Sequence, residues 1–466
     1  MTEGADATRP GRTYFVPAVR ITKLGKLRAG PEKGIELTEA QPDILSVEVT
    51  LVHHGVGQYC ITLNNWYDTL PEDRKAPHPP RMANEVTIGN LPAWPRFKYN
   101  DFAIFQFGDR LRIDMRYSLH DRDERERATG LDPVDAESHR WVPMISGPIS
   151  DIRFHFTEEE GNYVVVCGED DLCPLKDKNP KKTDYWAVPE IEIIKDVLKR
   201  ASYPLPVVFG PRPLPRFTED DARALAEAHF EGTSYLDYLM KFAERLDCEV
   251  FLEFADLDDP ESGVELHFER ARSRLPPDRT LRGIYLIERG RNLHTFKPDL
   301  KVVDQYTSVT VMGRDRVSSS PNQVSGTAPK PPETPGAATL WLDDELHRDP
   351  EQGDPPLLAG PDWRLRLYGE NPYTEINQRG LDPERADVMA DAKFRQKARE
   401  FLKIETETIG LPRLRAGRHV EIRGMRPPFD GFYYAETAVH TYGPEGLRTH
   451  VNGRRPGMPF PPYGES

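Results

Sequence analysis

The sequence predicts a mainly β protein in which two similar β-barrel domains lie on either side of an α+β module. Apolar and polar residues alternate in short runs in the first and last thirds of the chain, as they do in half-buried strands. The middle third changes to the helical period, and a β pattern of the first third recurs in the last third. We expect domains at 1–175, 176–295 and 296–466, in line with the roughly three domains that a chain of 466 residues suggests.

The first third consists of predicted strands joined by two long loops. Strands are expected at ILSVEVTL, at QYCITLNNW, on both sides of the Gly108–Asp109 turn in FAIFQFGDRLRIDMRY, at ISDIRFHF and at NYVVVCG. The polar loops run from Trp66 to about Tyr99 and through HDRDERERATG. Loops of this length are uncommon in a compact domain unless they contact a partner.

The middle third predicts helices followed by a β-hairpin. Helical spacing occurs in PEIEIIKDVLKRA, in TEDDARALAEAHF, where Thr218 and Asp221 form a capping-box variant, and in TSYLDYLMKFAERLD behind a Thr/Ser cap. CEVFLEF and VELHFER then alternate in period two around the turn DLDDPESG. Helices followed by a hairpin make this part of the chain the α+β module.

The last third returns to strands and contains one long helix. YTSVTVMG predicts a strand, and a segment rich in Pro, Ser and Gly, from about 318 to 362, predicts an inserted flexible loop. A helix is expected from about 382 to 403, with Asp382 as N-cap and Pro383 at the first helical position. IETETIG, GRHVEIRG and the strand pair in FDGFYYAETAVHTYGPEGLRTHVNGRR complete the chain.

Two stretches far apart in the sequence follow the same pattern. FGDRLRIDMR precedes ISGPISDIRFHFTEEEGNYVVVCG, and AGRHVEIRGM precedes FDGFYYAETAVHTYGPEGLRTHVNG. The span from Gly147 to Gly168 nearly matches the span from Gly431 to Gly453. We interpret this as an internal repeat of a β domain. Three copies of such a chain would present six similar domains in a ring, which allows a three-fold object to dock on a six-fold one.

The composition argues against several classes of protein. A formal net charge of −14 and a pI of about 5.5 disfavour a protein that binds nucleic acid, because such binding depends on Lys and Arg at phosphates. MTEGADATRPGRT contains no apolar segment of a signal peptide, and no run of 18 apolar residues occurs, so neither secretion by a signal peptide nor membrane insertion is expected. The four cysteines lack CxxC spacing and are expected as buried thiols in a reduced compartment.

Two acidic clusters are candidates for chemistry. Glu169, Asp170 and Asp171 offer an acid–base pair or a site for a divalent ion, but a solvated strand end followed by a turn is the favoured interpretation. The DLDDPESG segment resembles a calcium loop, yet it lacks the Gly at the sixth place and the distal Glu, so a polar hairpin turn explains it better.

Other candidate motifs are incomplete. His53 and His54 are adjacent on a predicted strand, so their side chains point to opposite faces and do not easily share a metal ion. Gly55-Val56-Gly57 is a fragment of a dinucleotide fingerprint with Cys60 in place of its third Gly and no following helix. The sequence contains no HExxH, Walker loop or G-x-S-x-G elbow. We therefore predict no catalytic, metal-binding or cofactor-binding residues, no cofactor and no enzyme activity.

The sequence resembles the baseplate hub proteins of contractile phage tails and related injection systems, the late control gene D family. It is also similar to the N-terminal hub half of type VI spike proteins. The resemblance lies in the order of several motifs, which covers most of the chain. They are ITLNNWYD, FGDRLRIDM, the ISGPISDIRFHF–GNYVVVCGED block, SYLDYLMKFAERLDCEVFLEF, FKPDLKVVDQYTSVTVMGRD, and LPRLRAGRHVEIRG followed by FDGFYYAETAVHTYGPEGLRTHVNGRR.

This resemblance implies a homotrimeric structural hub with two tube-type barrel domains. The implied partners are the inner tube or tube-initiator protein, the central spike and the surrounding baseplate wedge proteins, which HDRDERER would contact. Relatives continue into an oligosaccharide-binding barrel and a needle, whereas this chain stops at Ser466, so the spike is expected to be a separate chain. Arg454 and Arg455 stand where the fused relatives lead into their spike and are predicted to face it.

The hub is expected to be made and assembled in the cytoplasm and to reside in the baseplate of a particle that is either released or anchored. Two alternatives stay open. One is a carbohydrate- or peptidoglycan-active baseplate enzyme that uses paired carboxylates. The other is a soluble β-rich binding module whose long loops recognise a ligand.

Overall fold

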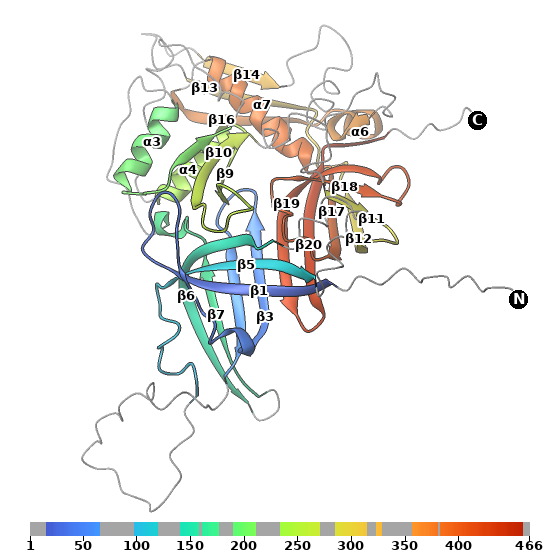
Figure 1. Ribbon diagram of the computed structural model, residues 1–466. Coiled ribbons are helices and arrows are strands. Elements are labelled where there is room, and N and C mark those ends of the chain that lie inside the picture. The colour runs from blue at the N-terminus through green and yellow to red at the C-terminus, as the bar shows by residue number, and fades with distance from the viewer. Residues whose placement is uncertain are drawn as a thin grey trace, which may run out of the picture.

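The computed structural model describes residues 15–65, 97–119, 140–157, 161–176, 190–210, 234–270, 285–314, 323–328, 357–380 and 383–459. Strands make up most of these residues, with helices gathered on one side of the molecule (Figure 1). The fold class predicted from the sequence, mainly β with an α+β insertion, is confirmed.

The first repeated unit, here called unit A, is a set of strands around one apolar core. Within the described residues its strands are β1 (Phe15–Leu24), β3 (Ile44–Val52), β4 (Gln58–Asn64), β5 (Arg110–Leu119), β6 (Val142–Thr157) and β7 (Gly161–Glu169). They pair in the spatial order β3-β4-β7-β6-β5-β1, and β2 (Ile35–Glu36) adds a short pairing beside β1. Tyr59, Ile61 and Leu63 alternate along β4 and are fully buried in this core.

The second repeated unit, unit B, repeats this strand order. Its strands among the described residues are β11 (Tyr285–Glu288), β12 (Leu293–Leu300), β17 (Leu402–Ile409), β18 (His419–Arg423), β19 (Gly431–Gly443) and β20 (Gly446–Arg455). They pair in the order β12-β17-β20-β19-β18-β11. When the six strands of each unit are numbered along the chain, both units have the spatial order 2-3-6-5-4-1. The predicted repeat therefore extends from the two hairpins to a whole set of strands. One difference is that β11 pairs parallel with β18, whereas β1 pairs antiparallel with β5.

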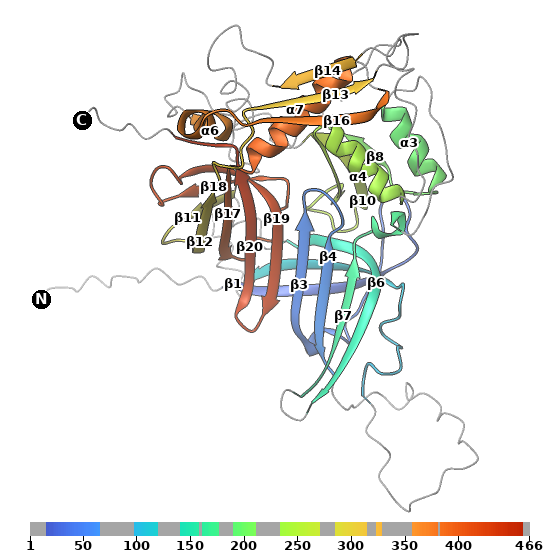
Figure 2. The same ribbon diagram turned by 180° about the vertical axis from the view of Figure 1, so that it is seen from behind.

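The two units are joined by strand pairing. Residues Thr437–Tyr442 of β19 pair antiparallel with Val47–Val52 of β3, with Thr437 opposite Val52. Figure 2 shows β20, β19, β3, β4 and β7 as neighbouring ribbons of one sheet. Units A and B therefore share a continuous hydrogen-bonded backbone instead of meeting only through side chains.

The described part of the middle module has two of the three predicted helices and the predicted hairpin. It contains α3 (Glu190–Arg200), β8 (Val207–Phe209), α4 (Tyr235–Arg245), β9 (Cys248–Phe254) and β10 (Val264–Arg270). Ser234 caps α4, and its side chain and that of Asp237 form a reciprocal capping box. Leu236, Leu239 and Ala243 of α4 are buried in the module's own core. The predicted domain boundaries of this module, at residues 175 and 295, stay a prediction. β11, which precedes residue 295, pairs with β18 of unit B.

A further layer is inserted between β12 and β17. It comprises β13 (Ser308–Arg314), β14 (Gln323–Ala328), β15 (Leu357–Ala359), α6 (Gly360–Tyr368), β16 (Pro372–Gly380) and α7 (Pro383–Arg399), and β15 pairs with β21 (Gly457–Pro459). α7 lies against the β14-β13-β16 sheet and buries Ala386, Ala390 and Phe394 against Val309 and Val311. The layer lies at the same end of the molecule as the middle module (Figure 1).

Several expectations need correction. The segment from 318 to 362, for which the sequence predicts a loop, contains β14 and β15, because β14 completes a sheet against α7. Of the two strands expected around Gly108, only the second, β5, forms. Phe102 in the first run has a φ of 57°, in the left-handed region that interrupts a strand.

The cysteine prediction is also wrong for one pair. Cys60 of β4 lies directly opposite Cys167 of β7, and the two are joined by a disulfide. Cys248 is a buried thiol, as expected, and Cys173 is a partly buried one. The helix expected at TEDDARALAEAHF, the loop between Trp66 and 96 and the HDRDERER run lie outside the described residues. No helix in the described part of the chain is long and apolar enough to cross a membrane.

Candidate functional site

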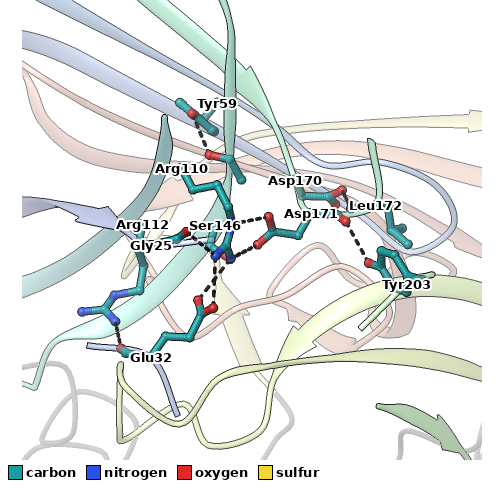
Figure 3. A network of polar contacts seen from close by, with 11 residues as sticks. Gly25, Glu32, Tyr59, Arg110, Arg112, Ser146, Asp170, Asp171, Leu172 and Tyr203 are labelled. Atoms are coloured by element: carbon teal, nitrogen blue, oxygen red, sulfur yellow. Dashed lines mark hydrogen bonds and ion pairs between the residues drawn. The ribbon is translucent and has the colours of Figure 1, made fainter. Parts of the chain in front are cut away.

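Asp170 and Asp171 of the acidic cluster at the end of β7 lie inside a buried polar network between unit A and the middle module (Figure 3), whereas Glu169 is only partly buried and pairs with Lys176 at 2.7 Å. Arg110 of β5 donates from Nε and Nη2 to the two carboxylate oxygens of Asp171, at 2.8 and 2.6 Å. The same guanidinium group donates to both oxygens of Glu32, at 3.0 and 3.1 Å, and Ser146 Oγ donates to Asp171 at 2.7 Å. One arginine thus bridges two carboxylates that lie 139 residues apart in the sequence.

Asp170 holds backbone groups in place. Its carboxylate accepts hydrogen bonds from the backbone N–H groups of Gly57 at 2.6 Å and Leu172 at 3.0 Å. Burial raises the pKa of Asp170 to about 8, because the charged form loses its hydration inside the protein. Since Asp170 and Asp171 are both buried and hydrogen-bonded, the cluster forms part of the packing between elements.

Two tyrosines extend the same network. Tyr203, which follows α3, donates its hydroxyl to the backbone carbonyl of Asp171 at 2.8 Å, and burial raises the pKa of this hydroxyl well above its usual value. Tyr59 donates to the carbonyl of Gly147 at 3.1 Å, and its ring occupies the space that a Cβ at Gly168 would need. Gly168 therefore allows close approach of a buried aromatic ring, whereas a Cβ at Gly147 would meet the backbone of Glu169 and Asp170.

The middle module is also attached through the turn between β9 and β10. Glu32 N–H donates to Glu261 C=O at 2.9 Å, and Arg112 donates to Pro260 C=O at 2.7 Å, both from unit A. From unit B, Arg413 donates to Asp258 at 2.6 Å. The aspartates of the suspected calcium loop serve this turn: Asp256 accepts from the N–H of Asp258 at 2.8 Å. The turn thus contacts both repeated units at once.

The two adjacent histidines bind different parts of the chain. His53 Nδ1 lies 2.8 Å from the carbonyl oxygen of Glu436 in unit B, and its Nε2 lies 3.8 Å from Glu249 of β9. His54 Nδ1 accepts from the N–H of Val250 in the middle module at 3.1 Å. Among the residues that the structure describes, no group of three or more His, Cys, Asp or Glu side chains is arranged to hold a metal ion.

Arg454 and Arg455, at the end of β20, point into the protein. Arg454 donates to Glu436 at 2.7 Å and lies 3.7 Å from Glu249. Arg455 is 2% exposed, donates to the carbonyls of Asp430 at 3.0 Å and Pro428 at 2.6 Å, and covers the ring of Tyr433. Both guanidinium groups are thus engaged within this chain, and their contact with a spike stays a prediction.

The histidine in the middle of this last strand pair is a structural residue. His440 is fully buried; its Nδ1 lies 3.0 Å from Thr449 Oγ1 and its Nε2 lies 3.0 Å from the carbonyl oxygen of Leu414. Burial and the nearby Arg415 together lower the pKa of His440 to about 3, so the ring is neutral at physiological pH.

The feature that sequence reasoning did not locate is the pairing of β3 with β19. It leaves two corresponding strand edges without a partner among the described residues. In the described part of the chain, β12 pairs as a strand with β17 only, apart from an isolated bridge between Leu293 and Arg289, and β6 from Asp151 to Phe156 pairs only with β7. Phe156 on β6 is 51% exposed and Leu300 on β12 is 36% exposed. Open strand edges with exposed apolar residues are typical places for pairing with another chain.

No protein-family model matches the sequence, and no curated protein matches it significantly. Two solved structures share its fold. A tail protein from Neisseria meningitidis MC58 superposes with a TM-score of 0.54 at 10% sequence identity, over 94% of this chain and 96% of that chain. The 43 kDa tail protein of prophage MuSo2 from Shewanella oneidensis superposes with a TM-score of 0.50 at 11% identity, over 94% of this chain and 98% of that chain. The chain therefore has the fold of these phage tail proteins.

Proposed function

We propose that this protein is the structural hub of a contractile-tail or injection-system baseplate, and that three copies form a ring of six similar units. The observation that carries the proposal is the pairing of β19 in unit B with β3 in unit A. This pairing is a contact between the fifth strand of one unit and the second strand of the other. If the same contact recurs between chains, it joins unit B of one copy to unit A of the next.

Recurrence of the β19–β3 contact between chains requires an open edge on the second strand of unit B and on the fifth strand of unit A. The second strand of unit B is β12 and the fifth strand of unit A is β6, and both have an unpaired side among the described residues. Contact between different surfaces of successive copies closes into a ring when the rotation allows it. Three copies with two units each would give a pseudo-six-fold ring in which each of these edges is paired.

The register of this contact follows from the repeat. The irregular position lies at Ser150 in β6 and at Glu436 in β19, which makes His155 equivalent to Thr441. Thr441 lies opposite Glu48 in the pairing within the chain. The corresponding irregular positions, Leu45 of β3 and His294 of β12, make Lys297 equivalent to Glu48. We therefore expect His155 of one copy to lie opposite Lys297 of the next.

A cysteine pair tests this arrangement directly. In a chain that carries His155→Cys and Lys297→Cys, mild oxidation should link neighbouring copies and yield covalent trimers on a denaturing gel. The matched control carries Phe156→Cys with Lys297→Cys, because a shift of one residue moves the side chain to the other face of the sheet. Native mass spectrometry of the unmodified chain should give a trimer; a stable monomer inside an intact particle would exclude the hub.

The partners that we propose follow from this role. The ring would join an inner tube or tube-initiator protein to a central spike, with baseplate wedge proteins around it. It would assemble in the cytoplasm and reside in a released or anchored particle. Alanine substitution of both Arg454 and Arg455 tests the spike contact, and normal spike attachment would remove that idea.

The buried carboxylates support a load-bearing role over a hydrolytic one. The carboxylates of Asp170 and Asp171 accept hydrogen bonds from groups of the first 175 residues, Gly57, Leu172 and Arg110, and Tyr203 of the middle module donates to the backbone carbonyl of Asp171. We expect Asp170→Asn with Asp171→Asn to weaken folding or assembly. Loss of a peptidoglycan-hydrolysing activity with assembly intact would favour the enzyme instead.

A further inference from the structure

Two exposed ion pairs lie on the strand edges that the proposed ring would join. On β6, Arg153 Nε lies 2.9 Å from Asp151 Oδ2, and at the end of β12, Lys301 Nζ lies 3.3 Å from Asp299 Oδ2. All four side chains are more than half exposed, so each pair by itself contributes little to the stability of one copy. The two members of each pair are two residues apart along the chain, so their side chains lie on the same face of the sheet.

The register expected between β6 of one copy and β12 of the next brings these charges together. Continued in steps of two residues along both strands, it gives two directly opposed pairs, Arg153 with Asp299 and Asp151 with Lys301. Lys301 follows the last residue of β12, but its N–H donates to the carbonyl of Phe401 at 2.9 Å, so the β12–β17 ladder includes it. Each of the four residues, here called the four-charge cluster, would thus have an opposite charge on its own strand and another across the contact between copies.

The other face of the same contact is apolar. Leu300 of β12 corresponds to Leu51 of β3, which packs against the cores of both units and lies opposite Ala438. Leu300 is 36% exposed in one copy. The register places it opposite Ile152, which corresponds to Ala438 and packs against the core of unit A. Leu300 would therefore bridge two cores between copies, as Leu51 does within the chain.

The contact within the chain has neutral residues where the contact between copies has charges. The positions of β19 and β3 that correspond to the four-charge cluster form the pairs Thr437–Val52 and Val439–Thr50. β-Branched pairs of this kind suit two strands that one chain already holds together. Complementary charges guide the encounter of separate molecules, and charges on an edge strand also oppose pairing with a wrong partner.

A slip of the two strands would remove the match of charges. A slip of two residues keeps the same faces together, but it brings Arg153 opposite Lys301 in one direction and Asp151 opposite Asp299 in the other. Like charges directly opposite each other on neighbouring strands are destabilising. On the basis of the ring proposed above, we infer that a second copy of this chain is the partner of both edges and that the four-charge cluster fixes the register of their pairing.

Exchange of the two charges within one ion pair tests the four-charge cluster and keeps that pair. Asp151→Arg with Arg153→Asp preserves an ion pair on β6 and the net charge, but it opposes like charges at both positions between copies. Asp299→Lys with Lys301→Asp does the same on β12. At low ionic strength, each exchanged full-length chain should need an about tenfold higher concentration to place half of its copies in trimers, measured by analytical ultracentrifugation. This difference should shrink at about 1 M salt, because screening then acts within about 3 Å.

The chain with all four substitutions opposes opposite charges again and should form trimers as readily as the unmodified chain. The matched control exchanges an exposed ion pair of α3, Glu192→Lys with Lys195→Glu, and should also form trimers normally. Normal assembly of both exchanged chains overturns the inference, as does failure of a folded fourfold variant to regain assembly. If the fourfold variant does not fold, a double-mutant cycle of Arg153→Gln and Asp299→Asn decides, because additive effects on assembly would exclude their contact.

The cysteine cross-link separates this inference from the ring itself. If the exchanged chains assemble normally while His155→Cys with Lys297→Cys still cross-links copies, the ring stands and the four-charge cluster does not fix its register. Absence of that cross-link in the chain without charge exchange, together with a monomer in native mass spectrometry, overturns the ring and the inference together.

Discussion

Asp247 and Arg399 lie 152 residues apart in the sequence and form a buried ion pair with two contacts, one of them 2.8 Å from Arg399 Nη2 to Asp247 Oδ2. Asp247 follows α4, and Arg399 is the last residue of α7. The pair therefore connects the middle module to the inserted layer. Burial by itself raises the pKa of Asp247, but Arg399 reverses this effect and lowers the pKa below its usual value.

Replacement of Asp247 should destabilise the protein strongly. Asp247→Asn keeps a residue type that tolerates the φ of 55° at this position but removes the negative charge that two nitrogens of the buried Arg399 contact. We expect a loss of about 3–5 kcal/mol in the free energy of unfolding, measured with urea at pH 7. The double change Asp247→Asn with Arg399→Met should recover much of the lost unfolding free energy.

Because the pKa of Asp247 is lowered in the folded state, the wild-type ion pair loses its contribution to stability as pH falls through that pKa. A single-variant loss under about 1 kcal/mol contradicts the prediction.

The pKa of Asp170 predicts the opposite pH dependence. Its folded-state pKa is about 8, above the value of about 3.9 for an unfolded aspartate. The contribution of this group to stability is therefore complete below about pH 4 and is lost as pH rises through about 8. Asp170→Asn should flatten the fall in unfolding free energy over this range. The exposed Asp151, replaced by Asn, is the control and should leave the slope as it is. An unchanged slope in Asp170→Asn means that the group is ionised in the fold.

Arg455 should contribute more to stability than an arginine at the surface. Arg455→Ala leaves the carbonyls of Asp430 and Pro428 without these donors and uncovers Tyr433. We expect a loss of about 1–3 kcal/mol in thermal or urea unfolding. Arg423→Ala, which removes a half-exposed pair with Glu421, should cost about 0–1 kcal/mol. Equal effects of the two substitutions would show that the burial of Arg455 does not stabilise the fold.

The Cys60–Cys167 disulfide should be detectable in purified protein under oxidising conditions. Alkylation after denaturation without a reductant should label Cys173 and Cys248 only. Cys60→Ser with Cys167→Ser should lower the unfolding free energy by about 2–4 kcal/mol, the usual range for removal of a disulfide. Cys173→Ser, at a free cysteine, is the control. Labelling of all four cysteines would show that Cys60 and Cys167 are separate thiols.

Local patterns in the sequence predicted most elements of the described fold. The capped stripe of apolar residues in α4, the alternation in β9 and β10, and Pro383 at the start of α7 act over a few residues, so they can be recognised without the fold. The repeat around Gly147 and Gly431 was recognisable for the same reason, because both hairpins need the same alternation and the same small residues. Within the segment expected as a loop, the prediction was wrong at 323–328, because β14 is stabilised by β13 and α7 and not by its own composition.

What the sequence by itself determined is thus the mainly β class, the repeated hairpins and the positions of α3, α4, α7 and the β9–β10 turn. Only the tertiary structure decided that β19 pairs with β3, that Arg110 bridges Glu32 and Asp171, and that Cys60 meets Cys167. These contacts join residues 61 to about 390 positions apart, as for Arg110 with Asp171 and His440 with Val49. The physical reason is that alternation specifies which side of a strand is buried, whereas the strand that becomes its neighbour is selected by the packing of the whole sheet.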